Sequence, residues 1–190
     1  FLVDKAVFDR IAATDLRDKT IVRFDRTKAR KITVVGWAEK TKQVNAVVIE
    51  KNKDGNWVST PVPNGTVIAN VPVTSPPITI DPLKVNTFLG VIDGLRADRF
   101  APPGDYGFDP TRRGLVVVIE MDGGAPRVQL NIGAGVTVDP DGKIKDQVPP
   151  EQATHFVVWA DTAADPSVNP FTIPAGPLKP FKEGPGSFGK

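Results

Sequence analysis

The chain has 190 residues, no cysteine and a nearly balanced charge, with 24 lysines and arginines against 22 aspartates and glutamates. The lack of cysteine excludes disulfides, thiolate nucleophiles and zinc–thiolate sites, and a net charge of +2 gives no electrostatic reason to expect nucleic acid or an anionic membrane as a partner. The 19 prolines, 17 glycines and many valines and isoleucines favour β-structure with long connections.

The sequence contains no membrane-targeting signal that we can identify. No apolar run approaches the roughly 20 residues that a membrane span needs, and no signal-peptide pattern is present. Because the chain begins with Phe1 instead of methionine, we expect it to be a processed or excised piece whose leader or anchor lay upstream.

The first third predicts a short helix followed by three antiparallel strands. Asp4 can cap a helix in which four apolar residues share one face, namely Val7, Phe8, Ile11 and Ala12. Residues 31–37 and 44–50 are rich in β-branched residues and predict two strands, and a turn containing Asp-Gly then leads into a third strand at residues 57–60. Five prolines between residues 61 and 77 indicate a surface loop.

The stretch from Ile80 to Phe100 predicts the main helix of the chain. Asp81 is a suitable N-cap and Pro82 suits the first helical position. Apolar residues then follow at the spacing of one helical face, at Val85, Phe88, Leu89, Ile92 and Leu95. Gly90 and Gly94 lie away from this face, and their cost to the helix favours the close approach of another element.

The second half predicts a connector followed by further strands. The connector covers residues 101–109, residues 115–120 have apolar residues on both faces as in a central strand, and residues 127–132 alternate as in a half-buried strand. A turn is predicted within residues 136–144, and 154–160 is the last predicted strand.

The proline-rich tail predicts a different kind of structure. Prolines at 166, 170, 174, 177, 180 and 185 alternate with apolar residues, so we expect an extended strap laid on the body, without a helix or an inner strand.

These elements predict an α+β fold built from two helix-plus-antiparallel-meander units around one compact body, with the main helix across a mostly antiparallel sheet. The halves are residues 1–77 and 78–160, and the strap is 161–190. Similar landmarks occur in both halves, including Val-Val-Ile-Glu at 47–50 and at 117–120, which indicates a degenerate duplication, although chance similarity between β-rich strings explains it equally well.

The sequence offers no assembled catalytic, metal or cofactor site, and we predict none. His155 is the only histidine, and a catalytic role would need a partner that the sequence does not show. Residues 139–143 have aspartates at alternate positions, but the rest of a calcium loop does not follow, so a tight turn is predicted. Residues 133–135 lack the third glycine and the helix of a phosphate-binding loop.

One region is rich in basic residues. It contains Arg23, Arg26, Lys28, Arg30, Lys31, Lys40, Lys42, Lys51 and Lys53. Proteins that bind single-stranded nucleic acid combine such charge with exposed aromatic rings, which are sparse here. We therefore interpret the cluster as a solvated face or a lysine-protected sheet edge, and we expect no nucleic-acid partner.

Short motifs between about residues 3 and 133 resemble those of a bacterial domain family of unknown function, family 4340. They are Leu16-Arg17-Asp18 leading to Phe24-Asp25, Asp54-Gly55-Asn56-Trp57 followed by Pro61, the run from Leu95 to Phe100, Tyr106 to Pro110, and Leu130 to Gly133. This chain has Phe108 where the family usually has leucine, and its proline-rich tail departs from the family pattern.

The family occurs in membrane-anchored accessory proteins encoded with ABC-type export and gliding-motility transporter subunits. The resemblance therefore implies a non-enzymatic domain on the extracytoplasmic, periplasmic face of a bacterial membrane, anchored by a segment outside this chain and binding a protein partner such as a transporter subunit. It implies no catalytic residues. Two alternatives are a polysaccharide- or cell-wall-binding module that uses exposed rings such as Trp37, Tyr106 or Trp159, and an uncharacterised enzyme that uses His155.

Overall fold

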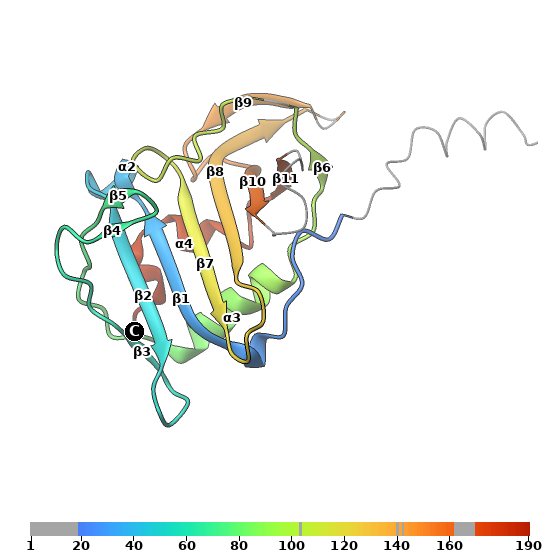
Figure 1. The fold of residues 1–190 in the computed structure, drawn as a ribbon. Helices are drawn as coiled ribbons and strands as arrows, with labels where there is room; N and C mark the ends of the chain where they lie inside the picture. Colours follow the sequence, from blue (N-terminus) through green and yellow to red (C-terminus); the bar gives the residue numbers. More distant parts are fainter. Residues whose placement is uncertain (1–18, 103, 140, 142, 162–169) are drawn as a thin grey trace, which may run out of the picture.

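The structure is a computed structural model and describes residues 19–102, 104–139, 141, 143–161 and 170–190. The helix predicted after Asp4 lies outside these residues. The fold is built on one nine-stranded sheet in the order β3-β2-β1-β7-β8-β10-β11-β6, with β9 paired to β8 beside this path (Figure 1). The strands are β1 (Ala29–Gly36), β2 (Asn45–Lys51), β3 (Trp57–Ser59), β6 (Arg99–Phe100), β7 (Leu115–Met121), β8 (Val128–Val138), β9 (Ile144–Val148), β10 (His155–Asp161) and β11 (Phe171–Pro174).

All pairings within this sheet are antiparallel, and one long helix covers one of its faces. The predicted α+β class with a mostly antiparallel sheet is therefore confirmed. The hairpin predicted at Asp54-Gly55 is also confirmed, because β2 pairs with β3 across that turn. Strands of the predicted halves 1–77 and 78–160 are direct neighbours, because β1 pairs with β7.

The two strands that flank β1 contain the same tetrapeptide. Residues 31–34 pair with Val-Val-Ile-Glu at 47–50 in β2 and with Val-Val-Ile-Glu at 117–120 in β7. The two tetrapeptides thus face one partner in one register, and Lys31 lies opposite Glu50 on one side and Glu120 on the other. Equivalent pairing positions explain the similarity of these strings without a duplication, which stays a prediction.

Helix α3 (Pro82–Asp93) covers one face of the sheet (Figure 1). The Asp81 carboxylate accepts a hydrogen bond from the Leu83 amide at 2.9 Å, as expected for an N-cap. The predicted apolar stripe is confirmed, because Phe88 is 1% exposed and Ile92 is fully buried.

The predicted extent of the helix, to Phe100, is wrong. The helix ends at its C-cap, Gly94. Beyond it the backbone takes other partners: Ala97 donates its amide to the Lys19 carbonyl, and β6 pairs with β11. Leu95 is buried all the same, outside the helix.

The carboxyl-terminal tail packs on the body, but the prediction that it holds neither helix nor inner strand is wrong. Strand β11 has β10 on one side and β6 on the other. Proline is tolerated here because Pro174 is the last residue of β11, opposite His155, and Pro170 precedes the strand, so no proline lies in the strand interior. The short helices α4 (Lys179–Lys182) and η2 (Pro185–Phe188) then place Phe181 and Phe188 against Phe88, with ring centroids 4.7 and 5.1 Å from that of Phe88.

Among the described residues, two separate segments cover the opposite face of the sheet. At one end, the loop predicted at 61–77 contains a small hairpin, β4 (Val67–Ile68) with β5 (Val71–Pro72), and buries Val73 against β1, β2 and β7. At the other end, the 101–109 connector crosses β8, and the Tyr106 carbonyl accepts a hydrogen bond from the Ala134 amide at 2.7 Å. A side chain at Gly133 would lie 2.4 Å from the Tyr106 carbonyl oxygen, so the glycine permits this crossing.

Two further short helices complete the described fold. They are η1 (Arg26–Lys28), capped by Asp25, and α2 (Ala38–Thr41), which begins after Trp37 in a left-handed conformation with φ of 64°. The predicted strand at 31–37 therefore stops one residue early, at Gly36.

Truncation of Phe88 tests the core assignment. Because its ring is buried between α3, α4 and η2, Phe88→Ala should lower the free energy of unfolding by roughly 3–5 kcal/mol. Leu83 is on the same helix but 73% exposed, so Leu83→Ala should change the free energy of unfolding by no more than about 0.5 kcal/mol. Denaturant titration measures both, and equal effects would contradict the packing described here.

Gly90 tests the packing on the other side of α3. A Cβ at Gly90 would meet only the end of the Arg26 side chain within 4 Å, at 3.0 Å, so the predicted close approach comes from a flexible side chain and not from another backbone. Gly90→Ala should therefore raise the free energy of unfolding by about 1 kcal/mol, through helix propensity. A free energy of unfolding below that of wild type, measured by denaturant titration, would mean that the Arg26 side chain cannot move away from the added methyl group.

Candidate functional site

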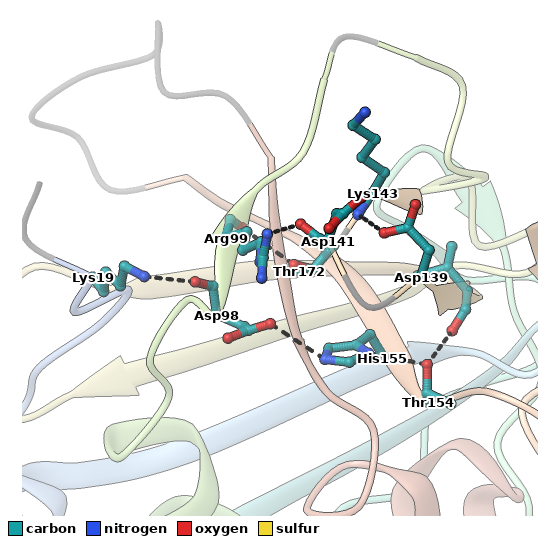
Figure 2. A network of polar contacts seen from close by, with 10 residues as sticks. Lys19, Asp98, Arg99, Asp139, Asp141, Lys143, Thr154, His155 and Thr172 are labelled. Atoms are coloured by element: carbon teal, nitrogen blue, oxygen red, sulfur yellow. Dashed lines mark hydrogen bonds and ion pairs between the residues drawn. The ribbon is translucent and has the colours of Figure 1, made fainter. Parts of the chain in front are cut away.

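The polar cluster around His155 lies where β6, β10 and the β8–β9 turn meet (Figure 2). His155 opens β10, and its Nε2 lies 3.4 Å from Oδ2 of Asp98, the residue before β6. The Nδ1 atom lies 3.0 Å from the Thr154 hydroxyl. Threonine, histidine and aspartate thus form a continuous chain of polar contacts, which the sequence did not predict.

Thr154 does not donate its hydroxyl hydrogen bond in the direction that an activated nucleophile requires. Its hydroxyl donates to the Val136 carbonyl at 3.2 Å, so it accepts a hydrogen bond from the imidazole when Nδ1 carries the proton. A general base would instead accept the proton of the hydroxyl. The imidazole therefore lies between Thr154 and Asp98 as a polar tie between β10 and the residue before β6.

The remaining contacts of the cluster join segments that are distant in sequence. Lys19 donates to the Asp98 carbonyl at 2.8 Å, and Arg99 donates to the Asp141 carbonyl. Asp139 accepts the Lys143 amide at 2.8 Å and donates its own amide to the Lys143 carbonyl at 3.0 Å. The Asp139 carboxylate thus closes the β8–β9 turn, as predicted for residues 139–143.

Sequence reasoning missed a second polar site, at Lys182 in α4. This lysine is 5% exposed, and its ammonium donates to the carbonyls of Arg113 at 2.5 Å and Gly133 at 3.1 Å. Its nitrogen also lies 5.5 Å from the centre of the Phe156 ring. Burial lowers the pKa of Lys182 to about 7. A lysine in a proline-rich tail carries no sequence signal for burial, so only the tertiary structure reveals it.

Four of the nine residues of the basic cluster form ion pairs within the described part of the chain, namely Arg26, Arg30, Lys31 and Lys40. Lys31 lies 3.4 Å from both Glu50 and Glu120, and Arg30 lies 3.3 Å from Glu120. These groups line an open hollow of about 580 Å³ beside the 52–55 turn. Lys51, Lys53 and Asp122 also line it, so the hollow has four cations against three carboxylates and little net charge for a polyanion.

The three aromatic rings proposed for polysaccharide binding have different environments. Trp37 is 4% exposed and donates from Nε1 to the Phe181 carbonyl at 2.8 Å, and Tyr106 is 6% exposed and donates to the Pro102 carbonyl at 2.8 Å. Only Trp159 is half-buried. A stacking role for Trp37 and Tyr106 is therefore excluded in this conformation.

An apolar hollow lies at the same end of the sheet as the polar one, between residues 21–25 and the β7–β8 turn. Its volume is about 660 Å³. Apolar side chains supply most of its wall, namely Ile21, Val22, Phe24, Met121, Ala125, Pro126 and Val128. Its rim carries Arg23, Lys28 and Arg127 against one carboxylate, Asp25.

Comparison with known proteins identifies no relative: no family model, no curated protein and no solved structure matches the chain. Within the described residues, no three histidine, aspartate or glutamate side chains are placed to share a metal ion. In the same part of the chain, no helix has the length and apolar character of a membrane span.

The buried Lys182 predicts a specific dependence of stability on pH. Its pKa is about 7 when folded and about 10.5 in the unfolded chain, so between these values the unfolded state binds more protons and stability rises with pH. From about pH 7 to 9, wild type should gain roughly 2 kcal/mol relative to Lys182→Met. Denaturant titrations across this range measure the difference, and parallel profiles would contradict the assigned burial.

Proposed function

We propose that this chain is a non-enzymatic interaction domain of a membrane-associated transport or surface-assembly complex. It works on the extracytoplasmic face of a bacterial membrane, is anchored by a segment outside this chain, and binds a protein partner such as a transporter subunit. The apolar hollow between residues 21–25 and the β7–β8 turn is the observation that carries the proposal of a protein partner. The membrane context rests on the family resemblance of the motifs.

The composition of the hollow fits a protein ligand. Its accessible apolar residues are Phe24, Ala125 and Pro126, because Ile21, Val22, Met121 and Val128 are at most 9% exposed. Apolar surface that is rimmed by polar residues is typical of interaction sites, and a volume of about 660 Å³ has room for a few apolar side chains. The rim has three cations and one carboxylate, and hydrogen bonds from Thr27 lower the pKa of that carboxyl, Asp25. The partner segment should therefore present apolar side chains flanked by acidic ones.

The His155 chain of contacts supports an enzyme less well. It joins Asp98, His155 and Thr154, but Thr154 donates to the backbone, and the Asp98 side chain is 46% exposed. Neither of the two large hollows described above is lined by these three residues. The polar contacts of this cluster join β6, β10 and the neighbouring turn, so a structural role explains the cluster.

Photo-crosslinking from two positions tests the proposal. A benzoylphenylalanine at Ala125, on the hollow, should crosslink a membrane transport subunit in the native membrane fraction, identified by mass spectrometry. The same probe at Leu83, which is 73% exposed on α3, should not. Arg127→Glu should lower the yield at Ala125 at least severalfold, because it reverses a rim charge.

Lys143→Glu is the matched control for charge reversal, since Lys143 is exposed but outside the hollow. Equal capture from Ala125 and Leu83, or capture only of proteins without a membrane-transport role, would reject the proposal.

A further inference from the structure

The helix-free face of the sheet contains a buried amide without a hydrogen-bond partner. Asn131 in β8 is 8% exposed, and its Nδ2 has no acceptor among the residues that the structure describes. Its neighbours across the sheet are Val116 in β7 and Trp159 in β10. Valine has no acceptor, and the indole N–H only donates, so the adjacent strands cannot satisfy this group.

A buried amide without a hydrogen-bond partner destabilises the folded state. A valine there would match Val116, its neighbour in β7, and would avoid this cost. A polar residue at this position is therefore expected to have a role other than folding, and an acceptor supplied by a ligand is the simplest one.

The surroundings of Asn131 indicate the ligand chemistry. Trp159 lies opposite Asn131 and is half-buried, whereas the other two tryptophans, Trp37 and Trp57, are 4% and 8% exposed. Gln129 is two residues from Asn131 on the same strand, so its half-buried side chain points to the same face. One accessible indole is thus next to two carboxamides.

We propose that Trp159, Asn131 and Gln129 form a subsite for a neutral polysaccharide. The apolar face of a pyranose ring can stack on the indole, while sugar hydroxyls accept from and donate to the two carboxamides. The three side chains carry no charge, and the row of Lys31 with Glu50 and Glu120 is internally paired. Asp161 in β10 is the pairing neighbour of Gln129. A sheet face offers side chains and no free backbone groups, which suits a sugar better than an extended peptide.

This inference does not depend on the protein partner proposed above, because the apolar hollow and the subsite share no residue. A failed crosslinking experiment would leave the subsite untouched, and the absence of sugar binding would leave the crosslinking result untouched.

The experiment uses the whole chain and two soluble probes, the β-1,4-linked hexamers of N-acetylglucosamine and of glucose. Calorimetric titration gives the affinity, and tryptophan emission reports the environment of Trp159. At least one hexamer should bind and change the emission. Trp159→Ala should then weaken binding at least about tenfold, and Asn131→Val should weaken it severalfold while the free energy of unfolding stays equal or rises.

Val58→Ala, at an exposed position in β3, should leave the affinity unchanged. Binding of neither hexamer at millimolar concentration would overturn the proposal, as would wild-type affinity in Trp159→Ala. Binding of a proline-rich peptide that competes at Trp159, without binding of either hexamer, would assign this face to a protein ligand and also overturn it. A loss of stability in Asn131→Val would show that the amide has a structural role.

Discussion

The pairing of β1 on both sides is the constraint on which the rest of this fold depends. Residues 31–34 face Val-Val-Ile-Glu in β2 and again in β7, so the same contacts form twice in one register. Ile32 and Val34 point to the helix-covered core, and Thr33 and Val35 point to the other face. A shift of β1 by one residue against its neighbours would turn Lys31 into the core and turn Ile32 and Val34 out of it. The cost of this exchange strongly favours the observed register.

This central strand decides what each face of the sheet becomes. The covered face receives α3 and the tail, whose rings Phe88, Phe181 and Phe188 form one cluster. Within the described part of the chain, the other face is covered by the loop at 61–77 and by the 101–109 connector. Between these covers, side chains of β8 and β10 stay accessible, so the candidate binding surfaces follow from the incomplete coverage of one sheet.

The polar sites of the molecule have two different physical roles. At Lys182 and at His155, charged or polar groups bridge segments distant in sequence, and each donor meets an acceptor of the protein. Asn131 differs because its amide is buried without an acceptor. Satisfied groups hold segments together, whereas the unsatisfied group is the better indicator of a ligand.

The sequence by itself determined the local elements. The stripe of Phe88 and Ile92 defined a helix face, and β-branched runs and the Asp-Gly turn defined the first hairpin, because periodicity and turn chemistry act over a few residues. Only the tertiary structure decided where α3 ends, that the proline-rich tail supplies an inner strand, and that Lys182 is buried. Each of these depends on pairing or packing with residues far away in the chain, as does the meeting of Asn131 with Trp159, and no local pattern encodes such a partner.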